Sequence, residues 1–270
     1  MQKNNFRLRP ILFSTQMVQY ILDGRKTQTR RIIKSRHKSG LFRFEKRNVD
    51  DTITGITSLD WDERPMSDST NDIKPKYQIG DILWVRETHK VGAWNDEEQK
   101  IAFDYKASPE LKKTPWVEYE NLDAFEKIHL KIIEELNRLG IEPSKIDEEN
   151  ERFYYKWEPG KSPLKWKPSI FMPFEAARIF LKVTNVRVER LHNISEQDAI
   201  SEGIDISLSF RGMPGTFYLN YLENKFNFSS PGLSFSSLWI SINGKDSWKE
   251  NPFVWVYDFE RCELPKDLLQ

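Results

Sequence analysis

The chain alternates between short, clearly patterned segments and long polar stretches. Residues 10–15 form an apolar run that predicts a strand, and Ser14 and Thr15 at its end favour the start of a helix. Apolar residues then recur at helical spacing through residues 17–22, and Gly24 marks the end of that helix. The amino-terminal part is therefore interpreted as a strand followed by a short helix.

The same reasoning predicts four more strands and three more helices. The strands are expected at residues 31–34, 82–85, 177–191 and 252–259. The helices are expected at residues 121–139, 195–203 and 235–242, each ended by a glycine. Several strands without alternating long helices favour an α+β fold with a mostly antiparallel, barrel-like sheet over a doubly wound fold.

The polar stretches between these elements are interpreted as insertions. They lie at about residues 35–76, 91–165 and 205–232. At 270 residues the chain is long enough for one large domain or two small ones, and we expect a single domain over residues 1–270.

Charge is balanced overall and uneven locally. The formal net charge is zero, with 38% hydrophobic and 30% charged residues. Residues 1–47 contain 13 Lys and Arg against 2 Asp and Glu, whereas residues 117–152 contain 5 against 11. A basic segment beside an acidic one is typical of a polyanion-binding face, and equally of two solvated surfaces of opposite sign.

Composition excludes several classes of site. The single cysteine, Cys262, excludes an internal disulfide framework and a multi-cysteine metal site, and the four histidines lack metal-ligand spacing. We therefore expect no metal and no cofactor. No stretch approaches the ~20 apolar residues of a membrane span, and the amino terminus lacks the apolar core of a signal peptide, so a cytoplasmic protein without membrane contact is expected.

The most distinctive polar segment is residues 25–31, with the sequence Arg-Lys-Thr-Gln-Thr-Arg-Arg. A hydroxyl such as that of Thr29 becomes a nucleophile when a neighbouring base, here Lys26, takes its proton. Arg30 or Arg31 would hold a carbonyl oxygen or a phosphate. The junction between helix and strand is expected to leave these side chains reachable, and the alternative is a basic strand end that only faces water.

Three further positions carry candidate chemistry. Arg86 and Glu87 follow the strand at residues 82–85 and form either a polar site or a surface ion pair. Glu202 ends the helix at residues 195–203, where a glutamate is either a site residue or simply solvated. Trp84 could stack on a base or belong to the core. No phosphate-binding glycine loop or standard hydrolase motif is present.

Taken together, these segments resemble the ASCH family, whose fold is a PUA-like β-barrel. The similar segments are residues 21–31, 80–85, the strand through Val188, residues 195–203 and residues 255–259. The chain is similar, more narrowly, to the large ASCH-like proteins of phage and prophage genomes, whose function is unassigned. The resemblance there covers residues 9–15, 83–88, 168–173 and 241–245.

The resemblance implies a link to RNA or nucleosides. ASCH domains are regarded as RNA-binding or RNA-linked modules, and one small bacterial branch hydrolyses N4-acetylcytidine with a lysine, a threonine and a glutamate. Carried over to this sequence, these residues are Lys26, Thr29 and Glu202, and Arg31 matches the signature arginine.

Three functions remain open from the sequence. The first is a module that binds RNA, a nucleotide or a modified nucleoside in a cleft around Lys26, Thr29 and Arg31. The other residues of that cleft would be Arg25, Arg30, Trp84, Arg86 and Glu87. The second is a metal-independent amidohydrolase acting on an acylated nucleoside, with Thr29 as nucleophile, Lys26 as base and Glu202 as proton carrier. The third is a phage accessory or host-interaction protein without catalysis.

Overall fold

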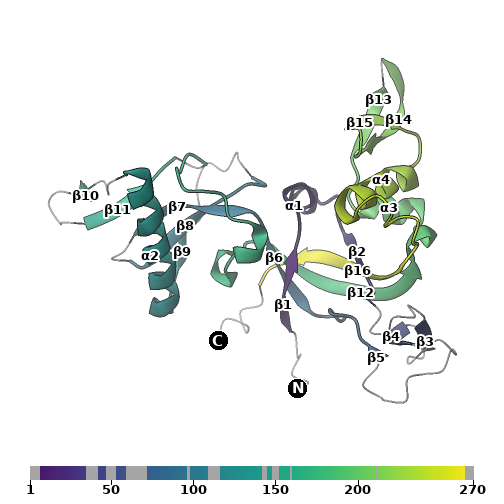
Figure 1. The fold of residues 1–270 in the computed structure, drawn as a ribbon, viewed down its shortest axis with the longest axis horizontal. Coiled ribbons are helices and arrows are strands. Elements are labelled where there is room, and N and C mark those ends of the chain that lie inside the picture. Colours follow the sequence, from purple (N-terminus) through teal and green to yellow (C-terminus); the bar gives the residue numbers. More distant parts are fainter. Residues whose placement is uncertain are drawn as a thin grey trace. The chain divides into compact units, whose positions relative to one another are not determined.

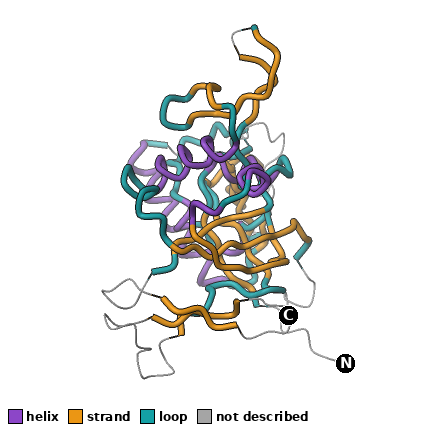
Figure 2. Tube along the Cα trace, turned by 90° about the vertical axis from the view of Figure 1, so that its right-hand side faces the viewer, coloured by secondary structure: helices purple, strands orange, loops and turns teal. Residues whose placement is uncertain are grey.

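The computed structural model describes residues 7–34, 42–46, 53–58, 72–95, 98–108, 116–141, 145–147, 152–158, 160–210 and 212–264. These residues form an α+β fold in which strands predominate over four α-helices (Figures 1 and 2). Within the described part of the chain, no helix is long and apolar enough to cross a membrane.

The five strands predicted from the sequence lie together in one sheet, in the order β1-β6-β12-β16-β2. Their bounds are Leu8–Leu12 for β1, Gln28–Ile32 for β2, Ile82–Arg86 for β6, Phe180–Arg190 for β12 and Phe253–Cys262 for β16. Strand β2 forms one edge and pairs antiparallel with β16, with Gln28 opposite Asp258 and Thr29 opposite Tyr257. The sheets of the described residues are open, so the barrel stays a prediction.

The predicted position of β2 is wrong by three residues. The strand was expected at residues 31–34 because only there does the sequence become apolar. Instead, β2 begins at Gln28, so most of the basic segment at residues 25–31 is itself strand. This segment lacks an apolar pattern of its own, and backbone pairing with β16 makes it a strand.

The chain divides into two compact units. The first contains residues Met1–Arg9, Tyr20–Leu83 and Leu181–Gln270, and the second contains Pro10–Gln19 and Trp84–Phe180. The expected insertion at 91–165 therefore belongs to the second unit, and those at 35–76 and 205–232 belong to the first. Much of residues 35–76 lies outside the described residues.

The first unit adds two small sheets and two helices. The three-stranded sheets have the orders β3-β4-β5 and β13-β14-β15. The bounds are Phe42–Lys46 for β3, Ile53–Ser58 for β4, Asp72–Ile73 for β5, Ile206–Phe210 for β13, Met213–Asn220 for β14, Lys225–Phe228 for β15, Glu196–Ser201 for α3 and Pro231–Asn243 for α4. Helix α4 begins four residues before its predicted start because Pro231 and Gly232, which the apolar pattern does not mark, fill its first turn. Its Phe235, Leu238 and Trp239 pack with Val254 and Val256 of β16 in one core.

The second unit is built on a five-stranded sheet with the order β10-β11-β7-β8-β9. The bounds are His89–Asn95 for β7, Lys100–Tyr105 for β8, Trp116–Glu118 for β9, Leu122–Leu139 for α2, Lys145–Asp147 for β10 and Arg152–Lys156 for β11. Helix α2 confirms its prediction, with Asn121 as its N-cap and Gly140 at its end in the left-handed region (φ 67°). Its buried Phe125, Ile132 and Leu136 pack against Trp94 and Phe103 of the sheet.

Two physical reasons require a glycine at position 203, and we predict that its replacement lowers the free energy of unfolding. Its φ of +89° is strained for other residues, and a Cβ there would lie 2.9 Å from Lys26 Cβ and 3.1 Å from Tyr20 Cβ. Gly24 has a similar φ of +73° with nothing within 4 Å of its Cβ position. Gly24→Ala therefore carries only the backbone strain of about 1–2 kcal/mol, whereas Gly203→Ala adds about 1–3 kcal/mol of overpacking.

Urea unfolding of the two variants measures this difference. Equal loss of unfolding free energy in Gly203→Ala and Gly24→Ala would contradict the close approach of Gly203 to Lys26.

Candidate functional site

The end of helix α1 (Thr15–Leu22) directs Lys26 into the interior of the first unit. Gly24 takes up a positive φ of 73° and reverses the chain. The backbone N–H groups of Arg25 and Lys26 then both donate to the carbonyl of Tyr20, at 2.9 and 3.0 Å. The Lys26 side chain has no solvent exposure as a result.

Glu202 reaches the same place from the other end of the chain. The Ser195 hydroxyl caps α3 by accepting a bond from the Asp198 N–H at 3.1 Å, as the sequence predicted. Glu202 directly follows the last residue of that helix as its C-cap, and its N–H donates to the Asp198 carbonyl at 2.9 Å. The Thr27 N–H donates to the Ser201 carbonyl at 2.9 Å, which joins the start of β2 to the end of α3.

Lys26 and Glu202 form a buried ion pair. The Lys26 ammonium donates to Glu202 Oε2 at 2.6 Å, to the Glu202 carbonyl at 2.9 Å and to the Gln28 carbonyl at 2.8 Å. These three bonds equal the number of N–H groups of an ammonium. Burial lowers the pKa of Lys26, and the charge and hydrogen bond of Glu202 oppose that shift without cancelling it.

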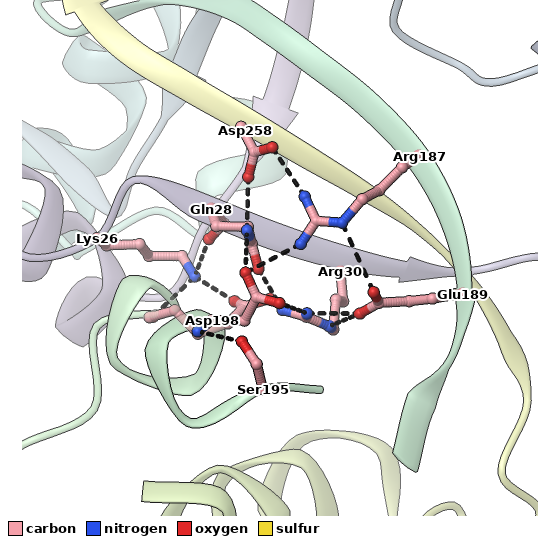
Figure 3. A network of polar contacts seen from close by, with 9 residues as sticks. Lys26, Gln28, Arg30, Arg187, Glu189, Ser195, Asp198 and Asp258 are labelled. Atoms are coloured by element: carbon pink, nitrogen blue, oxygen red, sulfur yellow. Dashed lines mark hydrogen bonds and ion pairs between the residues drawn. The ribbon is translucent and has the colours of Figure 1, made fainter. Parts of the chain in front are cut away.

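A second buried cation, Arg30, connects this pair to further carboxylates (Figure 3). Its guanidinium donates to Glu202 Oε1 at 3.1 Å and to Glu189 Oε1 at 3.0 and 2.5 Å, and its side chain has no exposure. It also donates to the Gln28 side-chain oxygen at 2.5 Å. The Gln28 amide in turn donates to Asp198 at 2.9 Å, so β2 and α3 share one polar network.

The network becomes more exposed toward β12 and β16. Arg187 on β12 donates to Asp258 on β16 at 2.8 Å and to Asp198 at 2.9 Å, and these side chains are between a fifth and a third exposed. Strands β2, β12 and β16 and helix α3 all contribute side chains to this one cluster (Figure 3). Three cations, Lys26, Arg30 and Arg187, thus meet four carboxylates, and no positive charge is left in excess.

Thr29 and Arg31 occupy the other face of β2. Side chains alternate along a strand, so Gln28 and Arg30 point toward α3 whereas Thr29 and Arg31 do not. Thr29 is buried beside Tyr257, its partner on β16. Burial lowers the pKa of Arg31, and the negative charge of Glu202 acts on it in the opposite direction. The charge of Glu202 therefore acts on this face of β2 as well.

Arg25 lies at the periphery of the site. It is 40% exposed, donates to Asp205 at 2.8 Å and stacks over the Tyr20 ring with 4.2 Å between the guanidinium carbon and the ring centroid. The Tyr20 hydroxyl donates to the same aspartate, and burial together with this bond raises the pKa of Tyr20. Arg25 is therefore the most accessible cation of the segment, although it too has a carboxylate partner.

Two expectations about accessibility are wrong. Lys26 and Arg30 were expected to be reachable, yet their side chains are fully buried because carboxylates from α3 and β12 cover them. Glu202 was expected to be solvated unless it served a site, and it is only 5% exposed because Lys26 and Arg30 hold it. In contrast, Lys26 and Glu202, which the resemblance assigns to one site, are in contact although they lie 176 residues apart.

The other predicted residues lie in the second unit and have partners there. Glu87 is buried and accepts bonds from Arg178 at 2.8 and 2.9 Å, so it is neither a surface pair nor a free carboxylate; burial raises its pKa. Arg86 donates to the Ile170 carbonyl and lies over the Trp84 ring at 5.3 Å. The Lys26 network is formed by residues of the first unit alone.

Sequence reasoning missed five members of the network. They are Gln28, Arg187, Glu189, Asp198 and Asp258. One signal was available in the sequence: charged residues at alternate positions of an otherwise apolar strand, as in residues 186–190. Such residues lie on one face of the strand, where neighbouring side chains must neutralise their charges.

Comparisons with known proteins add no assignment. No protein-family model, curated protein or solved structure matches the chain. Among the described residues, no three His, Cys, Asp or Glu side chains are grouped so that they could hold a metal ion.

We predict strong energetic coupling between Lys26 and Glu202. Lys26→Met leaves a buried carboxylate with one cation fewer, so it is expected to lower the unfolding free energy by about 3–5 kcal/mol. The double variant Lys26→Met/Glu202→Gln should lose less than the sum of the single variants, by at least about 1 kcal/mol. Lys225→Met, which removes an exposed lysine 3.8 Å from Glu223, is the matched control and should change stability by less than about 0.5 kcal/mol.

Additive losses in the urea unfolding of these variants would contradict the coupling.

Acid should weaken the network through Asp198. Burial raises the pKa of Asp198. The hydrogen bond from Gln28 and the charges of Arg187 and Arg30 lower this pKa by a larger amount, so the net shift is downward. A lowered folded-state pKa contributes stability above the unfolded pKa of about 3.8, and this contribution is lost as pH falls through the folded value. Asp198→Asn should therefore flatten the fall in stability below about pH 4, measured by unfolding at stepped pH. An unchanged slope would show that Asp198 does not titrate in this way.

Proposed function

We propose that the chain is an ASCH-like protein of PUA-like architecture whose site acts as an amidohydrolase on an acylated nucleoside. The supporting observation is the 2.6 Å contact between Lys26 and Glu202. The resemblance requires this contact, and two residues 176 positions apart in the sequence seldom meet by chance. The burial of Lys26 and Arg30 argues against the alternative in which these cations meet phosphates, because each already has carboxylate partners.

The proposed chemistry needs a neutral amine at Lys26. Burial lowers its pKa, and the proton can pass to Glu202 Oε2 along the 2.6 Å hydrogen bond. For catalysis the free amine would have to reach the Thr29 hydroxyl, on the other face of β2, and take its proton as this oxygen attacks the acyl carbonyl carbon. Arg31, on the same face of β2 as Thr29, would stabilise the resulting oxyanion.

The tetrahedral intermediate would then release the nucleoside. The C–N bond breaks, the leaving amine takes the proton from Lys26, and the acyl group remains as an ester on Thr29. Water, deprotonated by the same base, hydrolyses that ester. The net reaction consumes one water and yields the nucleoside and a carboxylic acid.

Binding without catalysis is the second candidate, and one observation favours it. The Lys26 ammonium already makes as many hydrogen bonds as it has N–H groups, which stabilises the protonated, non-basic form. In this case the Lys26 network would only hold the edge of β2 in place, and Thr29 with Arg31 would recognise a nucleoside, a nucleotide or an RNA base.

We predict that purified protein deacetylates N4-acetylcytidine and that Thr29 is essential. Thr29→Val keeps the volume of a buried residue and removes its nucleophile, so kcat should fall at least about a thousandfold. Thr29→Ser keeps the hydroxyl and should retain measurable turnover. Chromatography of cytidine formed from N4-acetylcytidine, and of products from other N-acyl nucleosides, measures the effect, with circular dichroism as the test of folding.

Each outcome separates the two candidates. Turnover that survives in Thr29→Val would overturn the assigned nucleophile. No turnover on any acylated nucleoside by the unmodified protein, together with saturable binding of the same compounds, would replace the enzyme by the binding module.

A further inference from the structure

The second unit contains a cavity that the proposed function does not use. It has a volume of about 410 Å³, within the usual range for small-molecule sites. Helix α2 supplies Ile128 and Lys131, and strands β7 and β8 supply its inner wall (Figure 1). The remaining wall is the segment from Trp166 to Pro173, in which Pro168 and Pro173 enclose the apolar residues 170–172.

The inner wall of the cavity is rigid and mostly apolar. Val91 and Phe103 are buried, and His89 packs its ring edge-on against Phe103 at 5.8 Å between centroids. The backbones of His89 and Lys167 exchange two hydrogen bonds, at 3.2 and 2.7 Å, which join the inner wall to the segment opposite. The cavity is therefore formed before any ligand arrives.

Two aromatic rings at the cavity are placed for stacking. Trp166 is 38% exposed, and the Lys90 ammonium lies over its ring at 4.9 Å from the centroid, which fixes the indole. Phe171 is 68% exposed, although it is a large apolar side chain. Exposed aromatic rings beside proline rings form flat surfaces on which a planar ring system can pack.

The charge of the lining is positive only. Lys131 and Lys167 both line the cavity, and no aspartate or glutamate does. Within the described part of the chain neither ammonium has an ion-pair partner, although Glu135 acts electrostatically on Lys167. This contrasts with the Lys26 network, where carboxylates cover every cation.

His89 adds a neutral polar atom. Its Nδ1 lies 3.2 Å from the Glu87 carbonyl, an arrangement in which Nδ1–H donates and Nε2 carries a lone pair. Burial lowers the pKa of His89 to about 4, so the ring is uncharged near neutral pH. No partner for Nε2 is found among the described residues, and it would accept a hydrogen bond from a ligand.

We propose that this cavity binds a planar aromatic compound that carries one anionic group, with the rings against Trp166 and Phe171 and the anion at Lys131 and Lys167. Aromatic carboxylates and nucleoside monophosphates share this chemistry. The site is independent of the amidohydrolase proposal, because its residues all belong to the second unit.

Two matched pairs of probes test the proposal by isothermal titration calorimetry. Indole-3-acetate is compared with the neutral indole-3-acetamide, and AMP is compared with adenosine. In at least one pair, the anionic member should bind at least about tenfold more tightly than the neutral one, because a charge-assisted contact is lost in the latter. The pair that shows the effect identifies the carboxylate or the phosphate as the preferred anion.

Lysine variants locate the binding. Lys131→Met and Lys167→Met should each weaken the anionic probe about tenfold. Lys127→Met removes another exposed lysine of α2 that does not line the cavity, and should change affinity by less than about twofold. Among the described residues, the side chains of Lys131 and Lys167 have no ion-pair partner, so we expect both variants to fold; circular dichroism verifies this.

Three results would overturn the proposal. They are equal binding of the anionic and neutral members in both pairs, no saturable binding of any probe at millimolar concentration, and affinity that is unaffected in both Lys131→Met and Lys167→Met. The last result would mean that the probe binds elsewhere on the chain.

Discussion

A lysine ammonium and a glutamate carboxylate buried together are the main constraint on the first unit. Removing such charges from water costs several kcal/mol for each ion, and only close geometry with further hydrogen bonds offsets that cost. The contact of Lys26 with Glu202 at 2.6 Å, supplemented by two backbone carbonyls, meets this requirement. The turns at Gly24 and Gly203 must therefore keep their geometry, because they deliver the two side chains.

The remainder of the network follows from this pair. Glu202 holds Arg30 as well as Lys26, and Arg30 requires a second carboxylate, which Glu189 provides. The charges added beyond Arg30 lie nearer to solvent, since Glu189 is 16% exposed and Arg187 is 31% exposed. A mostly buried cluster in which four carboxylates meet three cations attracts phosphates weakly. In the proposed function its chemical value is the lowered pKa of Lys26, which favours proton transfer over polyanion binding.

Much of the fold could be predicted because its elements have apolar patterns. Strands β1, β6, β12 and β16 of the main sheet show such patterns, and so do helices α1, α2 and α4. The start of β2 could not be predicted, since Gln28 to Arg31 are polar and only pairing with β16 makes them a strand. The carboxylate partners of Arg30 lie about 160 residues or more away in sequence, and no local pattern reveals such contacts. Lys26 and Glu202 were brought together only by a family resemblance.

The basic segment at residues 25–31 and the cavity lysines show why local charge in the sequence is a poor guide to a binding surface. Residues 25–31 are the most basic-looking segment of the chain, yet the structure neutralises their buried cations with carboxylates from distant strands and helices. Lys131 lies within the most acidic segment, yet its ammonium lines a cavity without a carboxylate in its wall. An anionic ligand responds to the charge left unpaired after folding, so it should prefer the cavity with Lys131 and Lys167 to the buried cations of residues 25–31.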